Sequence, residues 1–347
     1  MYIKKILLLI VALGLIAGGV FAYKVYDTIF SPNTIFNNEE AVVFIPTAAN
    51  INDVKELLVP LLKNPASFVQ VAERKGYANN VKGGKYAIQK GMNNNDIVNS
   101  LRSKNIPVKV AFNNQETIAD LAGRISSQIE PDSVSLLKVL TDEAFYSSNG
   151  FTDATQIAMF IPNSYEFFWN TSAEKFRTRM LSEYSRFWNE ERHTKAKTQG
   201  LTPNEVVSLA SIVHKETAKI DERPRVAGVY LNRLKKNMKL QADPTVIYAL
   251  KKHTGDFETV IKRVLYKDLE LDSPYNTYKY AGIPPGPITM PDISAIEAVL
   301  NPEKHDYYYF VANVENFGYH KFAKNLAQHN RNKTQYVRWI NSQNINR

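Results

Sequence analysis

A carboxylate lies within an apolar helical pattern in the middle of the 347-residue chain, where a charged side chain needs an explanation. The pattern consists of four side chains at intervals of four, three and four residues: Leu209, Val213, Glu216 and Ile220. These intervals place all four on one face of a helix. Burial on that face disfavours the ionised form of Glu216 and raises its pKa, which is the state that a general acid needs near neutral pH.

A structural interpretation of Glu216 stays open at this point. Lysines and arginines are frequent nearby, and an ion pair with one of them also perturbs the pKa of a carboxylate. Periodicity alone does not distinguish a carboxylic acid that transfers protons from one that pairs with a basic side chain.

The helix that carries Glu216 has a start signal. A capping box with proline at the first helical position is formed by Thr202, Pro203 and Glu205. A second helix is predicted to begin at Arg223-Pro224 and to end at the basic residues 235–237, which suit the negative end of a helix dipole. The Glu216 helix and this second helix form the central pair.

Composition limits the class of protein. The length allows two or three domains, and 44% hydrophobic with 22% charged residues is typical of a globular chain. The net charge of +9 favours anionic surroundings: a membrane surface, an anionic wall polymer or nucleic acid. Basic residues are scattered without interleaved aromatics, so no nucleic acid partner is expected. The absence of cysteine excludes disulfides, thiolate metal sites and a cysteine nucleophile.

The N-terminus predicts export. Residues 6–23 form an uncharged apolar run of 18 residues, the lower limit for a helix that spans a bilayer. Lys4 and Lys5 outweigh Lys24 on the far side, so the short end should stay in the cytoplasm. We expect a tip and transmembrane anchor at residues 1–26, in the bacterial cytoplasmic (inner) membrane, with the rest of the chain outside. A cleaved signal peptide is the competing interpretation.

Residues 39–130 repeat a small unit of strand, polar turn and short amphipathic helix. The strands are predicted at residues 42–45, 86–88 and 108–112, and the helices at 54–61, 97–101 and 118–125. Asn and Asp before each helix suit N-caps: Asn52-Asp53, Asn94-Asn95-Asp96 and Asn113-Asn114. The middle copy, GGKYAIQKGMNNNDIVNSL, resembles a LysM module, whose usual ligand is an N-acetylglucosamine polymer. Alternatively, the region is a plain spacer.

Residues 131–199 are predicted to be mostly helical. Val134, Leu137 and Leu140 indicate one helix, and residues 173–188 indicate another. Between them, MFIPNSYEFFWNTSAEKF is rich in aromatic rings that either stack on sugars or pack in a core. Glu166 in this stretch is a further candidate carboxylate.

The C-terminal third is rich in turns. Turn-rich segments at residues 240–245, 273–278 and 282–288 alternate with helices, and such loops usually carry substrate contacts. Residues 307–311 and 319–322 are predicted strands, followed by a basic C-terminal helix. The expected fold class is α+β: an N-terminal transmembrane helix, a small LysM-like strand-helix region and a mainly helical catalytic domain at residues 131–347 with some β structure.

Several spaced motifs, in this order, resemble those of the YceG-like family of endolytic murein transglycosylases. The motifs are LASIVHKET, LQADPTVIYAL, SPYNTY, GIPPGPI, YYYFVAN and HKFAKNLAQHN. The match extends over roughly residues 160–330, and an ordered set of motifs is far more specific than any one of them. The resemblance implies a membrane-anchored enzyme that cleaves the β-1,4 bond between N-acetylmuramic acid and N-acetylglucosamine, leaves 1,6-anhydro ends and uses no cofactor.

The resemblance also assigns roles to residues. Glu216 occupies the position of the catalytic glutamate, and the substrate-binding cleft residues are Gln241, Asp243, Asn276 and Tyr278. Asp243 precedes a proline, so it alternatively caps the next helix. The implied partners are peptidoglycan glycan strands, the cytoplasmic membrane and peptidoglycan synthases, with a role in terminating nascent strands.

Histidines raise two separate questions. The family often has an acidic residue where this chain has His214, but a helix turns about 200° over two residues, so His214 and Glu216 should point to different sides. His214 is therefore expected to be a flanking residue. His320 and His329 lack a carboxylate at ligand spacing, and we expect no metal site.

Two other classes remain open, and a third is disfavoured. A non-catalytic peptidoglycan-binding protein has no use for a buried glutamate. A muramidase-type hydrolase needs a second carboxylate about 5 to 9 Å from Glu216, for which Asp243 and Glu166 are candidates. A lyase that uses pyridoxal phosphate needs a Schiff-base lysine and a Gly-rich phosphate loop, and neither is evident.

Overall fold

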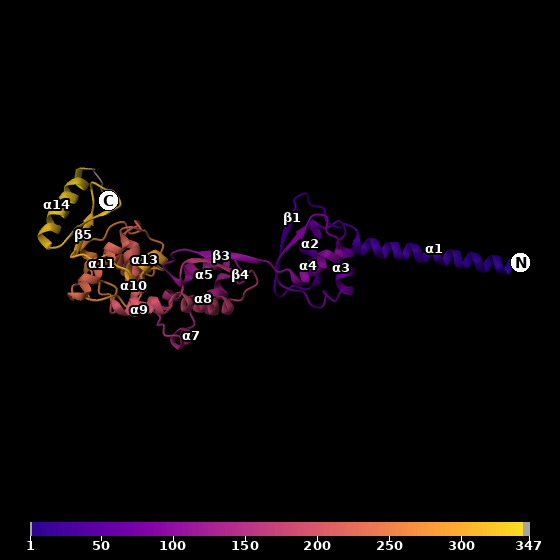
Figure 1. Cartoon of the computed structure of the whole chain (residues 1–347), viewed down its shortest axis with the longest axis horizontal. Helices are drawn as coiled ribbons and strands as arrows, with labels where there is room; N and C mark the ends of the chain where they lie inside the picture. The colour runs from indigo at the N-terminus through magenta and orange to yellow at the C-terminus, as the bar shows by residue number, and fades with distance from the viewer. Residues whose placement is uncertain (1, 343–347) are drawn as a thin grey trace. The chain divides into compact units, whose positions relative to one another are not determined.

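The computed structural model describes residues 2–342 and combines helices with small sheets (Figure 1). The α-helices are α1 (Tyr2–Phe30), α2 (Ile51–Leu58), α3 (Pro65–Arg74), α4 (Asn94–Ser103), α5 (Ile118–Ser126), α6 (Ser133–Leu140), α7 (Glu143–Ser148), α8 (Ala173–Phe187), α9 (Glu190–Thr198), α10 (Pro203–Glu216), α11 (Arg223–Lys235), α12 (Asp243–Thr254), α13 (Ile293–Leu300) and α14 (Leu326–Ser342). The strands are β1 (Glu40–Ile45), β2 (Gly84–Gln89), β3 (Pro107–Phe112), β4 (Asn163–Phe168), β5 (Tyr309–Ala312) and β6 (His320–Ala323). The 3-10 helices are η1 (Val59–Leu61), η2 (Gln156–Met159) and η3 (Tyr266–Glu270). A mixed fold of helices and strands is confirmed.

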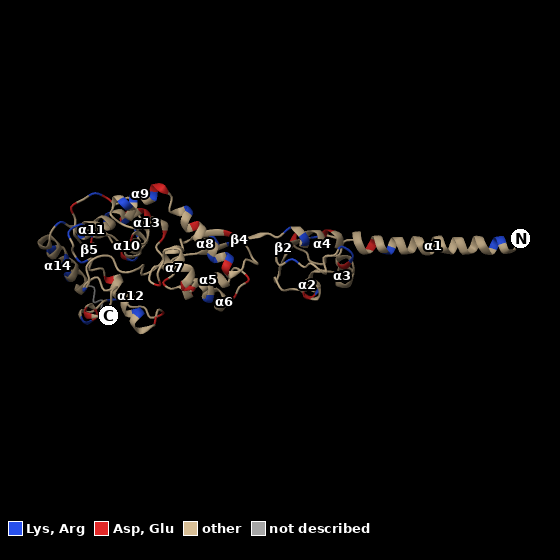
Figure 2. Cartoon of the chain, turned by 90° about the horizontal axis from the view of Figure 1, so that it is seen from below, with Lys and Arg blue, Asp and Glu red and all other residues tan. Residues whose placement is uncertain are grey.

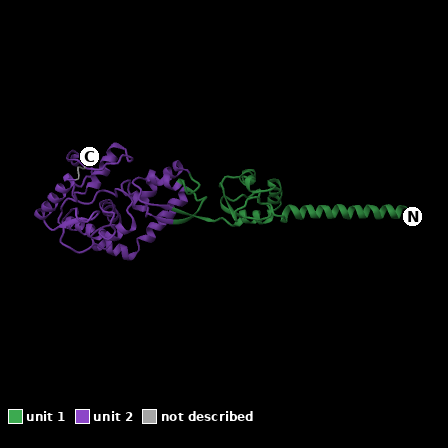
Figure 3. Cartoon of the chain, turned by 90° about the horizontal axis from the view of Figure 1, so that it is seen from above, with its two compact units in different colours: residues 1–110, 126–131, 165–172 green, residues 111–125, 132–164, 173–347 purple. Residues whose placement is uncertain are grey.

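The chain divides into two compact units (Figure 3). Unit 1 comprises residues 1–110, 126–131 and 165–172, and unit 2 comprises residues 111–125, 132–164 and 173–347.

The N-terminal helix α1 is long and apolar enough to cross a membrane. None of its described residues is buried, and Figure 2 shows basic residues at its start followed by a long uncharged stretch. The predicted helix at residues 6–23 is therefore confirmed as a helix. A signal sequence near an N-terminus meets the same length and composition criteria.

Unit 1 has an apolar core between a two-stranded sheet and short helices. Strands β1 and β2 pair antiparallel, with Val43 opposite Tyr86, and both side chains are buried. Ile88, Ile97 and Leu101 are fully buried in the same cluster. Alternation along the strands and helical spacing along α4 bring these apolar side chains to one interior, as the pattern predicted.

The three strand-turn-helix copies exist as elements, and α5 begins at Ile118 as predicted, but α2 and α4 begin three residues earlier than expected and the caps of all three helices differ. The caps are Asn50 for α2 and Asn93 for α4, and Thr117 accepts a hydrogen bond from the backbone of Asp120 at the start of α5. Each cap is offset from the Asn or Asp expected for it, because several neighbouring polar residues compete for one position. Helix α3, which lies between the first two copies, was not predicted.

Unit 2 is organised around the packing of α10, α11 and α13 against one another. All residues from Val206 to Val213 on α10 are buried. Gly228 on α11 allows a close approach, since a Cβ atom there would lie 2.6 Å from the carbonyl oxygen of Glu303. Helix α10 is therefore buried along most of its length, and its neighbour α11 is closely packed.

Two apolar positions depart from the expected pattern. Ile220 is 64% exposed because α10 ends at Glu216, where Thr217 turns to extended backbone with φ −139° and ψ 132°. Val134 is 75% exposed, whereas Leu140 is buried as expected, together with Leu136 on the same helix α6. Beyond the helices, β5 and β6 pair antiparallel near the predicted strand positions, with Ala312 opposite His320.

Candidate active site

Glu216 is the last residue of α10, and its carboxyl group is bound by a tyrosine from the next helix. The predicted capping box of Thr202 and Glu205 starts α10. Tyr230 of α11 donates a hydrogen bond from its hydroxyl to Glu216 Oε1 at 2.7 Å. Tyr230 is buried, whereas the Glu216 side chain keeps partial exposure. The carboxyl group is thus held by protein and still accessible to a ligand.

Burial raises the pKa of Glu216 to about 7. The hydrogen bond from Tyr230 and the electrostatic effects of His320 and Arg233 act in the opposite direction, and the negative charge of Asp243 adds to the increase. A carboxyl group that titrates near neutral pH donates a proton as an acid and accepts one as a base with similar ease. This is the chemistry expected of a single acid–base residue.

Arg233 of α11 holds the segment that follows its helix. Arg233 is 7% exposed, and its guanidinium group donates hydrogen bonds to the carbonyl oxygens of Lys239 and Leu240 at 3.0 and 2.9 Å. It also reaches Gln241 Oε1 at 3.3 Å. Gln241 has a left-handed backbone, with φ 50°, and an exposed side chain. A non-glycine residue held in this conformation marks a constrained loop at the site.

Asp243 and Tyr278 meet at the start of α12. The Tyr278 hydroxyl donates a hydrogen bond to Asp243 Oδ1 at 2.6 Å. Asp243 is the first helical residue, and the preceding Ala242 makes no side-chain cap, so Asp243 does not act as the helix cap. Burial and the neighbouring Asp243 raise the pKa of Tyr278, which keeps its hydroxyl protonated.

Asn276 is fully buried, and its hydrogen bonds lie within its own loop. Its side-chain amide donates to the carbonyl oxygens of Leu269 and Leu271, and its Oδ1 accepts from the backbone N–H of Tyr278. The structure therefore gives Asn276 a part in shaping the loop that carries Tyr278. Direct contact with a substrate stays a prediction for this residue.

Glu222 and His320 form a second pair beside Glu216. Glu222, between α10 and α11, accepts hydrogen bonds from the backbone N–H of His320 at 2.6 Å and from its Nδ1 at 2.8 Å. The side chain of Thr217, the residue after Glu216, also donates to Glu222. Together with the electrostatic effect of His320 on Glu216, this brings His320 into the site.

His214 lies on the flank of α10 and takes part in a different network. Its Nδ1 is 3.3 Å from Asp292 Oδ2, and Arg223 Nη1 donates to Asp292 Oδ1 at 2.6 Å. Asp292 also caps α13. These contacts connect α10, α11 and α13, so the partners of His214 are structural.

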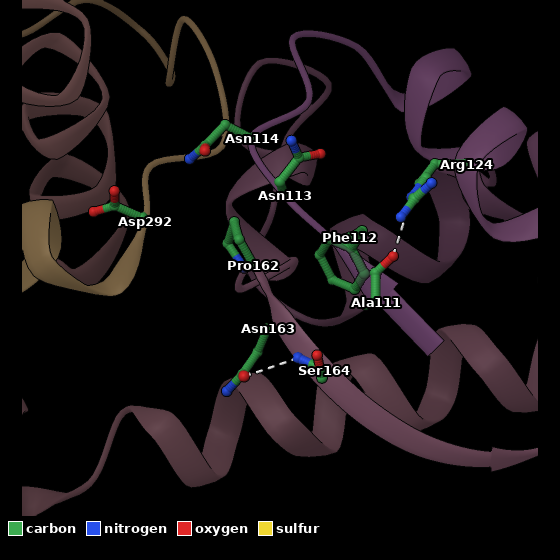
Figure 4. A pocket seen from close by; sticks show the side chains of 9 residues that line it. All are labelled: Ala111, Phe112, Asn113, Asn114, Arg124, Pro162, Asn163, Ser164 and Asp292. Carbon is green, nitrogen blue, oxygen red and sulfur yellow. Dashed lines mark hydrogen bonds between the residues drawn. The ribbon is translucent and has the colours of Figure 1, made fainter. Parts of the chain in front are cut away.

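A cavity of about 570 Å³ lies in unit 2, with Asp292 in its wall (Figure 4). Its lining residues are Ala111, Phe112, Asn113, Asn114, Arg124, Pro162, Asn163, Ser164 and Asp292. Glu216 is not among them, so this cavity and the acid–base residue are separate features.

The remaining candidates from the sequence have these positions. Glu166 lies in the exposed row of β4, within unit 1. His329 of α14 stacks against Tyr309, with ring centroids 5.2 Å apart. Among residues 2–342, no group of three or more His, Asp or Glu side chains is placed to hold a metal ion.

Sequence reasoning missed four residues of the site: Tyr230, Arg233, Glu222 and His320. Tyr230 lies inside the second predicted helix, and its position in the sequence gives no sign of the hydrogen bond to Glu216. His320 was considered for metal binding alone. Glu222 and His320 are 98 residues apart, and no local signal in the sequence links residues at that separation.

Comparisons with known proteins give the family. The sequence model described as the YceG-like family matches residues 43–335. The chain is 31% identical over 342 residues to a Bacillus subtilis protein named endolytic murein transglycosylase, covering 93% of this chain and 91% of that protein. This chain therefore belongs to the YceG-like family.

Two further relatives agree with this assignment. A Streptococcus pneumoniae protein of the same name is 29% identical over 352 residues, and the alignment covers 92% of this chain. The chain spans 63% of the length of that protein. A crystal structure of a putative YceG-like protein from Listeria monocytogenes has a TM-score of 0.57 at 30% identity, covering 85% of this chain and 99% of that one.

Proposed function

We propose that this protein is a lytic transglycosylase that cleaves peptidoglycan glycan strands internally, with Glu216 as the catalytic acid and base. The observation that carries the proposal is the Glu216 carboxyl group, whose pKa burial raises to about 7 and which Tyr230 holds at 2.7 Å. Relatives over almost the whole chain bear the name endolytic murein transglycosylase.

The reaction needs one carboxyl group and no water. Protonated Glu216 gives its proton to the glycosidic oxygen as the bond between C1 of N-acetylmuramic acid and that oxygen breaks. The carboxylate then takes the proton of the C6 hydroxyl as O6 bonds to C1, which forms a 1,6-anhydro end. The same residue acts as acid and then as base, as microscopic reversibility permits.

The substrate-binding residues form part of the proposal. Asp243 and Tyr278 share a hydrogen bond near Glu216, and the exposed Gln241 is held by Arg233. We assign the glycan to this face of unit 2, with Asn276 maintaining the loop. No cofactor takes part in this mechanism.

Hydrolysis is the second candidate, because Asp243 acts electrostatically on Glu216 and offers a second carboxylate. A hydrolase would use that carboxylate to activate water. The products separate the two: a transglycosylase releases 1,6-anhydro ends, and a hydrolase releases reducing ends that are heavier by one water.

The decisive experiment is mass spectrometry of purified peptidoglycan digested with the full-length protein in detergent. We expect 1,6-anhydro products from the wild type and a loss of at least about a thousandfold in rate for Glu216→Gln. Glu191→Gln is the matched control, since that carboxylate lies exposed on α9 and pairs with Lys195 at the surface.

Each other outcome has a defined meaning. Products with reducing ends would show that the protein is a hydrolase and would contradict the proposed transglycosylation. Retained glycan binding without any product would favour the non-catalytic peptidoglycan-binding protein. Activity of Glu216→Gln close to that of the control would remove Glu216 from the mechanism.

We also propose that α1 anchors the protein in the cytoplasmic membrane. The short N-terminal end would lie in the cytoplasm, and the chain after α1 would lie on the outer side of that membrane. Support comes from the apolar length of α1 and from the basic residues at its start. The intact mass of the protein from cell membranes tests this. A mature chain that lacks α1 would indicate a cleaved signal sequence.

Two finer roles extend the proposal. The LysM-like region is assigned to N-acetylglucosamine polymers, and protection of residues 84–101 from hydrogen exchange by such oligomers tests this. We also propose that the protein terminates nascent strands beside peptidoglycan synthases. Crosslinking in cells tests this, and repeated purification of the crosslinked protein without any synthase would count against the proposal.

A further inference from the structure

The buried guanidinium group of Arg233 has no part in the proton transfers proposed above. Its Nε donates a hydrogen bond to the carbonyl oxygen of Tyr308 at 2.6 Å. Its Nη1 donates to the carbonyl oxygens of Lys239 and Leu240 and, at 3.3 Å, to Gln241 Oε1. All four acceptors are uncharged oxygens. Because a buried cation without a carboxylate partner is costly, stability alone does not explain this arginine.

The position of Arg233 is fixed by residues outside the loop that it binds. Its Cζ lies 5.1 Å from the ring centroid of Tyr309 on β5, which is a cation–π distance. His329 of α14 stacks on the same ring, with centroids 5.2 Å apart. The preceding residue, Asn232, donates to two carbonyl oxygens within residues 305–307. The guanidinium group is therefore placed independently of the loop.

The bound loop presents Gln241 at the surface in a constrained conformation. Gln241 has a φ of 50° and an exposed side chain. Its backbone N–H donates to the carbonyl oxygen of Thr277 at 3.1 Å, and the N–H of Ala242 donates to Thr277 Oγ1 at 3.0 Å. Thr277 is 2% exposed and lies 2.9 Å, Oγ1 to Oγ1, from Thr245. A buried threonine pair thus holds the backbone of Gln241, while Arg233 holds its side chain.

The bond to Arg233 determines which end of the Gln241 amide is available to a ligand. A guanidinium group has donors only, so the amide atom that faces it is the oxygen, Oε1. The nitrogen, Nε2, is then the other end of this exposed side chain, and no acceptor within residues 2–342 takes a hydrogen bond from it. Its two hydrogens can be donated to the oxygen of a ligand.

We propose that Arg233 is a positioning residue that orients the Gln241 amide, so that Nε2 donates a hydrogen bond to an oxygen of the glycan. This inference rests on the proposed function, which assigns the glycan to this face of unit 2. Glycan strands carry hydroxyl and acetamido oxygens, which accept such bonds. A side chain held in its binding orientation beforehand loses less conformational freedom when the ligand binds. Arg233 therefore contributes to binding through Gln241.

The first test removes the donor and keeps an acceptor for Arg233. Gln241→Glu preserves the shape of the side chain, offers Arg233 a carboxylate oxygen and removes both hydrogens of Nε2. Binding of soluble glycan strands without stem peptides is measured with the full-length protein in detergent, in a Glu216→Gln background to prevent cleavage. We expect Kd to rise about 5- to 20-fold. Tm should not fall, because Arg233 gains an ion pair.

A purely structural bond between Arg233 and the loop predicts a different result for Gln241→Glu. Because the bond to Arg233 is kept and strengthened, the variant would then bind glycan at least as tightly as its parent. An unchanged or lower Kd would therefore overturn the proposal. Gln335→Glu is the matched control, since Gln335 Oε1 also accepts from a basic side chain, that of Lys321, at 3.2 Å. Its Kd should equal that of the parent.

A second variant tests Arg233 itself. Arg233→Lys keeps the positive charge, but a single ammonium group does not replace a planar fork that serves both Tyr308 and residues 239–241. With Glu216 intact, we expect KM to rise about 5- to 20-fold and kcat to change less than about threefold, since the lost interaction is one of binding. Arg186→Lys, exposed on α8, is the matched control. A fall in kcat at unchanged KM would contradict a role in binding.

A double variant shows whether Arg233 acts through Gln241. Gln241→Leu removes the amide without adding a charge, so little remains for Arg233 to orient. Arg233→Lys combined with Gln241→Leu should therefore raise Kd by clearly less than the product of the two single effects. Effects that multiply fully would show two separate roles and contradict the inference.

Failure of this inference and failure of the proposed function are distinguishable in the binding experiment. If the Glu216→Gln parent binds no glycan, the proposed function is wrong and the inference falls with it. If the parent binds glycan and Gln241→Glu binds it equally well, the inference alone is wrong.

Discussion

The two compact units bury different kinds of side chain. The described buried polar residues of unit 1 are uncharged: Asn33, Thr34, Asn94 and Ser100. The side-chain amide of Asn33 donates to Asn94 at 2.7 Å, which satisfies one such pair internally. Unit 2 instead buries the ionisable side chains of Glu222, Arg223 and Arg233.

This difference in buried side chains indicates that the stability of unit 2 depends more on electrostatic interactions than that of unit 1. Removing a charge from water costs several kcal/mol unless partners compensate it, so an apolar core with neutral amides is the simpler route to stability. Unit 2 compensates each buried charge with named partners, and two of the three, Glu222 and Arg233, lie beside Glu216. We therefore expect the stability of unit 2, but not that of unit 1, to depend strongly on pH.

The largest effects should come from one substitution in each unit, and these should differ in their dependence on pH. In unit 2, Asp292→Ala leaves the buried Arg223 without its carboxylate and removes the cap of α13, so we expect a loss of about 3 kcal/mol at pH 7. In unit 1, Ile88→Ala opens a cavity at a fully buried position, with a loss of about 3 kcal/mol. Denaturant unfolding followed by hydrogen exchange measures each unit separately.

The pH dependence of these two losses distinguishes them. Although burial opposes the shift, hydrogen bonds from His214, Arg223 and Ser294 hold the pKa of Asp292 far below its usual value. Its contribution is therefore present above the unfolded pKa and is lost as pH falls. At pH 3 the deficit of Asp292→Ala should shrink, while that of Ile88→Ala should persist. Equal behaviour of both variants would contradict the contrast between the units.

A second prediction concerns the cost of keeping Glu216 protonated near neutral pH. Its folded pKa of about 7 exceeds the unfolded value of 4.5, so the folded state loses stability as pH rises through this interval. Glu216→Gln removes the titration and keeps an acceptor for Tyr230. We expect it to stabilise unit 2 by about 1–3 kcal/mol at pH 8 and by little at pH 4.

Thermal unfolding at the two pH values, with Glu191→Gln as control, measures this effect. Glu191 is exposed and its pKa is lowered by Lys195, so its replacement should give no stabilisation at pH 8. A Glu216→Gln protein that is less stable than wild type at pH 8 would mean that the carboxylate is not penalised by burial.

Local features of the site were predictable from sequence, because they depend on neighbours within a few residues. The capping box, the proline at the first helical position and the apolar spacing placed Glu216 on a helix, and that helix was confirmed. The prediction that Ile220 continues the buried face of this helix was wrong, because apolar spacing does not indicate that the helix ends before Thr217. Strands β1 and β2 were recognised, but their pairing with each other was not.

Distant features were not predictable in this way. Glu222 finds His320 across 98 residues because β6 and the loop before α11 pack in one unit. Arg233 is one basic residue among several near the end of the second predicted helix, yet it is buried and donates hydrogen bonds to the carbonyl oxygens of Tyr308 and Lys239. Buried charges follow from the tertiary arrangement, which the periodicity of a single helix does not contain.

A smaller effect is expected at Asp243. Its negative charge raises the pKa of Glu216, so Asp243→Asn should lower that pKa and move the alkaline limb of kcat/KM to lower pH by less than about one unit. The amide oxygen still accepts the bond from Tyr278. A displacement of the alkaline limb to higher pH in Asp243→Asn would contradict the electrostatic account of the site.

The smallest effects should come from helix caps, one in each unit. Asn93 caps α4 through a hydrogen bond from the backbone of Asp96 at 2.9 Å, so Asn93→Ala should cost about 1 kcal/mol at any pH between 3 and 8. Asp132 caps α6 at 2.7 Å, and this bond from Ser135 lowers its pKa.

The capping contribution of Asp132 is present above its unfolded pKa and is lost as pH falls through the folded one. Asp132→Ala should therefore match wild type more closely at pH 3 than at pH 7, whereas the deficit of Asn93→Ala should stay constant. Hydrogen exchange of the first turns of α4 and α6 at both pH values reports each cap directly. Equal pH dependence of the two capping contributions would show that the charge of Asp132 does not distinguish its cap from that of Asn93.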